Sequence, residues 1–336
     1  MKLTAQRASE LLHAFSTCHV LVIGDLMLDR YVSGRVERIS PEAPVPVLHA
    51  TGERSVPGGA CNVALNITAL GGHSGICGAT GEDREGGVLL EHLESFGVDV
   101  SCVLRSSEIQ TVVKTRYVSD RHQLLRVDQE DPAQISSLPV EKLLAVLEPG
   151  IKKADGVILE DYGKGLLRQD LVSQVLASCE ESGIPTGYDP KENHELDVKG
   201  ITFATPNRNE TFRMANVADR TPDEDPLQDA CLLQASNTLV DLWQPEHLLM
   251  TLGPQGMLLN NAEHENLLIP TRAREVFDVS GAGDTVIATV LLALSAGADF
   301  VEAAELANIA AGLVVAKLGT ATTSPEEILK AIETVS

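Results

Sequence analysis

Short apolar runs alternate with longer amphipathic segments along most of the chain. Residues 20–23 form a continuous apolar run that ends at Gly24 and Asp25, as expected for a central parallel strand. The same pattern predicts strands near 74–79, 100–104, 157–159, 185–188, 201–204 and 248–250, a hairpin at 256–269, and helices near 60–70, 86–95, 138–148, 168–181, 227–240, 282–295 and 301–316. Strands alternating with helices predict an α/β fold whose mainly parallel sheet is covered on both faces.

Two segments interrupt this alternation. Residues 31–50 mix β-branched and charged residues with three prolines, which predicts edge strands outside the main sheet. Residues 110–128 contain two apolar runs around a polar tip at 119–122, which predicts a second hairpin. We therefore expect one domain over residues 1–336 with a small β lid inserted in it.

The charge and the cysteine content limit the functions and partners that the chain can have. The 26 basic and 48 acidic residues give a net charge of −22, which argues against nucleic acid as a partner. A few local cations can still hold a small phosphorylated substrate. The six cysteines are dispersed without a C-x-x-C pair, as in a protein of a reducing compartment. The longest apolar stretch, 286–294, is too short to cross a bilayer, so we expect a cytoplasmic protein with no membrane partner.

The strongest chemical signal is the run 278–285, which precedes an apolar helix. Glycines at a helix start let backbone amides approach an anion, and the helix dipole adds positive potential there. Asp284, within this turn, suits a hydroxyl that loses its proton while attacking phosphorus. From spacing alone, an N-capping aspartate is an equally good interpretation.

This run resembles the C-terminal signature D-T-x-G-A-G-D of the PfkB carbohydrate kinases and departs from it only at Val279. The resemblance implies a ribokinase-like three-layer sandwich, with Asp284 as the catalytic base. It assigns the anion hole to the amides of Gly281, Ala282 and Gly283. Residues 57–62 resemble the N-terminal signature of the family, which implies that Gly58, Gly59 and Asn62 bind the sugar; a helix start with a buried polar residue is the alternative.

Further segments resemble the nucleotide site of the family. Residues 207–210 (Asn207, Arg208, Asn209 and Glu210) resemble its N-x-x-E element, which implies that Glu210 holds magnesium through water. An exposed helix start would fit the same residues. Thr251, Gly253 and Gly256 resemble its nucleotide loop, beyond a strand end, and Asn308 lies where the family meets adenine, although it also fits a polar helix face. The family implies ATP and Mg²⁺ as cofactors, and its members often use K⁺ beside the anion hole.

Longer matches narrow the resemblance to the bacterial D-glycero-β-D-manno-heptose 7-phosphate kinases. They cover residues 24–31, 38–47, 114–117, 125–128, 161–165, 189–191 and 317–322. This resemblance implies phosphorylation of the anomeric hydroxyl to the 1,7-bisphosphate, in ADP-heptose and lipopolysaccharide core biosynthesis. Many such kinases are fused to a nucleotidyltransferase. No H-x-G-H element follows Asp284, so we expect a stand-alone kinase or an excised domain.

Charged residues near strand ends and on the lid suit a phosphosugar. Asp25 and Asp29 can accept hydrogen bonds from sugar hydroxyls. Cations that fit a distal phosphate lie on the second hairpin, namely Lys114, Arg116, Arg121 and Arg126, although each also fits a solvated face. Lys164 and Lys191 follow strand ends and would face the sugar or ATP. Because isolated hairpins are marginally stable and expose their edges, we expect the lid to pair in a homodimer.

Other functions fit the sequence less well. No G-x-G-x-x-G follows the first strand and no G-x-x-x-x-G-K-[ST] occurs, which disfavours a dehydrogenase and a P-loop kinase. Within the family, a kinase for another sugar or phosphosugar is the alternative. A non-catalytic sugar-phosphate sensor with the same fold is the alternative from another class.

Overall fold

The computed structural model describes residues 3–119, 122–220, 222–261, 265–273 and 275–334. Within these ranges, nine strands form the main sheet in the order β13-β12-β11-β10-β9-β8-β1-β4-β5. They are β1 (His19–Gly24), β4 (His73–Gly81), β5 (Asp99–Ser106), β8 (Gly156–Glu160), β9 (Thr186–Asp189), β10 (Phe203–Ala204), β11 (His247–Thr251), β12 (Met257–Asn261) and β13 (Asn266–Ile269). Neighbours pair in parallel except at the β11–β12–β13 end, which confirms the predicted mainly parallel sheet.

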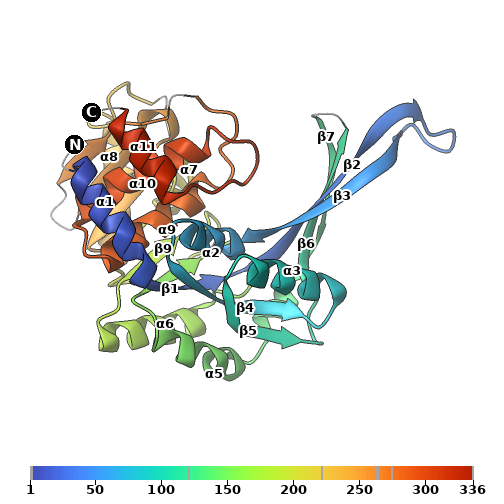
Figure 1. Ribbon diagram of the computed structural model, residues 1–336, viewed down its shortest axis with the longest axis horizontal. Coiled ribbons are helices and arrows are strands. Elements are labelled where there is room, and N and C mark those ends of the chain that lie inside the picture. Colours follow the sequence, from blue (N-terminus) through green and yellow to red (C-terminus); the bar gives the residue numbers. More distant parts are fainter. Residues whose placement is uncertain (1–2, 120–121, 221, 262–264, 274, 335–336) are drawn as a thin grey trace.

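Helices cover both faces of this sheet. They are α1 (Ala5–Ala14), α2 (Ala60–Ala69), α3 (Arg84–Ser95), α4 (Pro132–Ser136), α5 (Val140–Ile151), α6 (Gln169–Ser182), α7 (Arg208–Met214), α8 (Ala230–Trp243), α9 (Ala282–Ser295), α10 (Phe300–Val314) and α11 (Pro325–Glu333), with 3₁₀ turns η1 (Phe15–Thr17) and η2 (Gly253–Gln255). Side chains alternate across a strand. Val20 and Val22 therefore join the core under α1, α2, α9 and α10, while Leu21 and Ile23 join the core under α5, α6 and α8. These two cores confirm the three-layer α/β architecture (Figure 1).

The predicted lid is a separate four-stranded sheet in the order β3-β2-β6-β7. Its strands are β2 (Leu26–Ile39), β3 (Pro46–Gly59), β6 (Val112–Ser119) and β7 (His122–Gln129). Parallel pairing of β2 with β6 joins the two hairpins. The first hairpin is longer than the predicted 31–50, because pairing continues into the core to Leu26 and Gly59. In Figure 1 the lid extends from the body, with β2 and β3 (blue) reaching farthest.

Several elements differ from the sequence prediction. No helix was predicted at either end, yet α1 and α11 bury Leu11 and Ile328 in the core. β10 is reduced to Phe203–Ala204, shorter than the predicted 201–204. None of the helices among the described residues combines the length and apolar character needed to cross a membrane.

Candidate active site

Asp284 lies in the first turn of α9 and is only 7% exposed. The Asn62 side chain, on α2, donates a hydrogen bond to Oδ2 of Asp284. The Tyr162 hydroxyl donates one to Oδ1 at 3.1 Å. Burial raises the pKa of the Asp284 carboxyl, and these two donors oppose that rise. The structure thus brings the two predicted signature segments together around one buried carboxylate.

Glycine is required where these segments meet. Gly281 has φ 80° and caps α9, and a Cβ there would come 2.7 Å from Nδ2 of Asn62. Gly59 has φ 61°, and a Cβ there would lie 2.5 Å from the Asp25 carbonyl oxygen. A Cβ at Gly58 would lie 2.3 Å from Oδ2 of Asp29. The predicted glycines therefore allow close packing of α9, α2 and the base of the lid. Ala282 and Gly283 complete the first turn of α9.

Asp25 is 2% exposed and binds the protein backbone. Its carboxylate accepts hydrogen bonds from the amides of Tyr162, Lys164 and Leu166 at 3.1, 2.9 and 3.1 Å. Burial raises the pKa of Asp25, and these amides oppose the rise. A residue predicted to bind sugar hydroxyls therefore fixes the loop that follows β8, a contact that the sequence analysis did not anticipate.

The cations predicted to bind the substrate lie close to carboxylates. Arg116 forms an ion pair with Asp29, and Lys164 pairs with Glu130 at 2.7 Å. Burial and the charge of Lys164 lower the pKa of Lys114, so these two ammonium groups are neighbours from different elements. Of the two further predicted cations, Arg126 lies on the exposed strand β7 and pairs with Asp128 at 2.9 Å, and Arg121 lies outside the described residues.

The residues 207–210 form the start of α7. Asn207 accepts a hydrogen bond from the Glu210 amide at 3.0 Å, and Glu210 accepts one from the Asn207 amide at 2.8 Å, which is a capping box. Arg208 pairs with Asp219 and Asp229, and Asn209 donates to Glu192. The helix-start interpretation of this segment is confirmed. Glu210 also lies near Lys191, which opposes the rise that burial causes in its pKa.

The predicted nucleotide loop joins β11 to β12. Thr251 forms an isolated parallel β-bridge with Asn207. This backbone pairing places the two predicted nucleotide segments side by side. Gly253 and Gly256 have φ 57° and 93°, and a Cβ at Gly256 would lie 2.1 Å from the Ile269 carbonyl oxygen. Asn308 is buried and donates to the Pro270 carbonyl at 2.6 Å, which ties α10 to the segment after β13.

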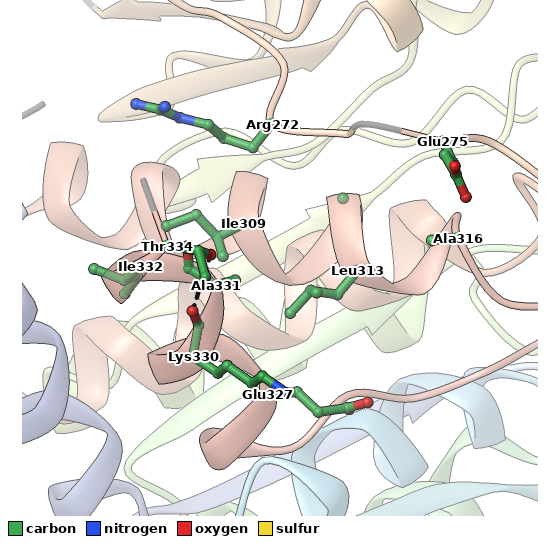
Figure 2. A pocket seen from close by; sticks show the side chains of 11 residues that line it. Arg272, Glu275, Ile309, Leu313, Ala316, Glu327, Lys330, Ala331, Ile332 and Thr334 are labelled. Atoms are coloured by element: carbon green, nitrogen blue, oxygen red, sulfur yellow. Dashed lines mark hydrogen bonds between the residues drawn. The ribbon is translucent and has the colours of Figure 1, made fainter. Parts of the chain in front are cut away.

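A cavity of about 520 Å³ lies beside this segment. Figure 2 shows Ile309 and Leu313 of α10 and Lys330 of α11 on one side, with Arg272 and Glu275 across from them. The chain runs on from Glu275 to Asp278, which accepts a hydrogen bond from the Ser280 amide. The cavity therefore adjoins the segment leading to the glycine turn. Because α11 was not predicted, sequence analysis could not find this cavity.

Sequence analysis also missed an acidic cluster at the ends of β8 and β9. One carboxylate oxygen from each of Glu160, Asp189 and Asp284 lies within 4.8 Å of the others. Glu160 is fully buried, and no donor group among the described residues reaches either of its oxygens. Burial raises its pKa well above the usual range, and the charges of Asp189 and Asp284 raise it further. Burial raises the pKa of Asp189 well above its usual range as well, so Glu160 and Asp189 compete for a proton. Glu160 and Asp189 each end a β-strand, and this position is the feature of the sequence that could have indicated the cluster.

Residues 18–327 match the family described as pfkB family carbohydrate kinase. The chain belongs to this family of carbohydrate kinases. It is 40% identical over 314 residues to the bifunctional protein HldE of Desulfatibacillum aliphaticivorans, covering 94% of this chain and 63% of that protein. It is 44% identical over 313 residues to HldE of Chromohalobacter salexigens, covering 93% of this chain and 63% of that protein. The chain thus spans less than two thirds of the length of these relatives.

Solved structures show the same fold at low sequence identity. Arabidopsis thaliana ribokinase complexed with ribose and ATP has a TM-score of 0.71 and 20% identity, covering 94% of this chain and 99% of that chain. Phosphofructokinase-2 from Escherichia coli in complex with potassium has a TM-score of 0.72 and 18% identity, covering 95% and 98%. These matches confirm the predicted ribokinase-like fold.

Proposed function

We propose that this chain transfers the γ-phosphoryl group of ATP to the anomeric O1 of D-glycero-β-D-manno-heptose 7-phosphate. The product is the 1,7-bisphosphate used in ADP-heptose and lipopolysaccharide core biosynthesis. The carrying observation is the buried Asp284, held by Asn62 in the glycine turn that starts α9. The sequence resemblance to heptose 7-phosphate kinases and the similarity to HldE proteins support the choice of sugar.

The geometry supports a direct transfer. Asp284 accepts the proton of the anomeric hydroxyl as its oxygen bonds to the γ-phosphorus and ADP leaves. The amides of Gly281, Ala282 and Gly283, at the positive end of α9, stabilise negative charge on the transferred group. No water is needed as a reactant, so the enclosed position of Asp284 also protects ATP from hydrolysis.

Magnesium and the nucleotide belong on the Glu210 side of the site. The half-buried Glu210 carboxylate is a hard oxygen donor of the kind Mg²⁺ prefers, and we assign it the ion, held through water. Bound Mg²⁺ supplies positive charge that offsets the ATP phosphates. Thr251, Gly253 and Gly256 would lie along the nucleotide and Asn308 near the adenine. Potassium beside the anion hole is the further ion that the family resemblance implies.

The 7-phosphate is assigned to cations at the base of the lid. Burial and the charge of Lys164 lower the pKa of Lys114, against the opposing charges of nearby carboxylates such as Glu130, so the two ammonium groups repel each other. A phosphate between them would remove that repulsion and replace the contact between Lys164 and Glu130. We add Arg116 and Arg126 to this group from the same sheet, where the two residues are paired across β6 and β7.

We also propose that the lid mediates a homodimer. Leu124, Leu125 and Val127 of β7 are exposed, with Leu125 at 56%. Exposed apolar residues on a sheet with open edges favour pairing with another chain. We place the enzyme in the cytoplasm, since all six cysteines are free thiols and most are buried, as in a reducing compartment.

A substrate panel tests the function. ADP release is measured with MgATP and heptose 7-phosphate, the unphosphorylated heptose, ribose or fructose 6-phosphate. We expect the highest kcat/KM for heptose 7-phosphate. A higher value for another sugar would replace the heptose assignment, and turnover of none of them would favour a sensor.

A further inference from the structure

The loop 161–166, which follows β8, places the hydroxyl group of Tyr162 beside the carboxylate of Asp284. Tyr162 donates to Oδ1 of Asp284 at 3.1 Å, while Asn62 binds the other oxygen. The two donors come from different elements: Tyr162 lies in the loop after β8, and Asn62 lies on α2. Each carboxylate oxygen accepts more than one hydrogen bond, so a sugar hydroxyl can still reach Asp284. The donors leave the carboxylate little freedom to rotate.

The loop is itself fixed to the central strand. Three of its amides, alternating along the chain, bind the Asp25 carboxylate at the end of β1. Gly163 and Gly165 have φ 65° and 101°, and a Cβ at Gly165 would lie 2.3 Å from the Pro132 carbonyl oxygen. Three charge-assisted hydrogen bonds hold the loop. If the loop moved Tyr162 away from Asp284, the buried carboxylate of Asp25 would lose its hydrogen-bond donors.

The same loop contacts two other parts of the fold. The Lys164 side chain binds Glu130, which directly follows lid strand β7. Asp161 binds the His194 ring at 2.7 Å and the Gly163 amide at 2.8 Å. The loop therefore joins the central strand, the lid and the base within a few residues.

We propose that Tyr162 is a positioning residue for Asp284: its hydroxyl, held in place by Asp25, orients the base and stabilises its ionised form. This inference rests on the proposed role of Asp284. It assigns a part in the reaction to a residue outside both family signatures. Tyr162 acts through the carboxylate, not through the substrate, so its loss should lower kcat more than it alters KM.

The test compares Tyr162→Phe with Tyr188→Phe. Tyr188 is a buried tyrosine of β9 whose hydroxyl has no hydrogen-bond partner among the described residues, so its variant makes the same chemical change without losing a contact. We expect Tyr162→Phe to lower kcat by about 10- to 100-fold, the usual effect of losing a hydrogen bond to a charged group. The KM for the sugar should change little. Tyr188→Phe should match the wild type.

The pH profile separates positioning from packing. Since the Tyr162 hydroxyl lowers the pKa of Asp284, its removal should move the acidic limb of the kcat profile to higher pH. The other charged groups facing Asp284 are Glu160 on β8, Asp189 on β9 and Asp29 on β2, and the variant changes none of them. A lower kcat with an unmoved limb, a change in KM alone, or values equal to Tyr188→Phe would each overturn the proposal.

A second measurement does not need turnover. The Asp284 carboxyl can be titrated by ¹³C NMR in aspartate-labelled protein, with its resonance assigned by its loss in Asp284→Asn. We expect a higher pKa in Tyr162→Phe than in the wild type or Tyr188→Phe, and an equal pKa would overturn the inference. If the wild type phosphorylates no sugar, the proposed function fails, while this titration still decides the role of Tyr162.

Discussion

The side-chain amide of Asn62 donates a hydrogen bond to the buried carboxylate of Asp284, although 222 positions separate the two residues in the chain. The contact joins the start of α2 to the start of α9. It is possible because Gly281 has no Cβ to obstruct the amide. In the proposed reaction, this carboxylate accepts a proton from the sugar hydroxyl.

Replacement of the base should separate chemistry from binding. Asp284→Asn keeps the shape of the side chain but removes its basicity, so kcat should fall by about 10²- to 10⁴-fold. ATP affinity, measured by calorimetry, should stay close to that of the wild type. Turnover near the wild-type value would show that another group accepts the proton.

The lid cations should control discrimination between sugars. Arg116→Ala combined with Arg126→Ala should lower kcat/KM for heptose 7-phosphate while changing that for the unphosphorylated heptose little, because charge-assisted contacts to phosphate are lost. Arg35→Ala, at an exposed position farther along the lid, is the matched control. If the ratio of the two specificity constants is unchanged in the double variant, the phosphate is held elsewhere, with Lys164 and Lys191 the next candidates.

The acidic cluster should make stability depend on pH. Burial, followed by the charges of Asp189 and Asp284, raises the pKa of Glu160. The folded protein keeps this proton where the unfolded chain has released it. The stabilisation is therefore complete below the unfolded pKa of about 4.3 and is lost as the pH rises toward the folded pKa.

Glu160→Gln mimics the protonated form and removes the contribution of Glu160 to this dependence. The Tm of the variant minus that of the wild type, measured in EDTA, should grow as the pH rises from about 5 to about 9. Glu180→Gln, at an exposed position on α6, should show no such trend. A constant or shrinking difference for Glu160→Gln would mean that Glu160 is ionised in the folded protein.

The lid should determine the oligomeric state. Light scattering should give a mass of twice the 35.9 kDa of one chain, and Leu125→Asp on β7 should reduce it toward that of the monomer. Phe96→Asp, which changes an equally exposed apolar residue after α3, should remain dimeric. A wild-type monomer at micromolar concentration would contradict this assembly.

The predictable parts of the fold depend on local patterns. Residues 20–23 identify β1 through their unbroken apolar run, and Gly281 and Gly283 mark the start of α9. The full length of β2 and β3 could not be predicted, because it depends on pairing with the core end of the lid. The helix α11 begins with a Ser324 capping box, a signal that was present but not used.

The candidate active site could be predicted only for residues that belong to a recognisable sequence segment. Asp284 and Asn62 each belong to a recognisable segment, and the structure brings them together. The partners of Asp25 lie 137 to 141 positions away in the chain, and no local pattern indicates such a distant contact. The same limit applies to Tyr162 and to the pairing of Arg116 with Asp29, which only the assembled fold reveals.

The most direct test of the central claim follows the fate of the phosphoryl group. The protein is incubated with MgATP and heptose 7-phosphate, and the reaction is monitored by ³¹P NMR. We predict a second sugar phosphate signal, coupled to the anomeric proton, that grows in step with ADP and forms about 10²- to 10⁴-fold more slowly with Asp284→Asn. Consumption of ATP with phosphate released to water, or a new phosphate at any carbon other than the anomeric one, would contradict the account.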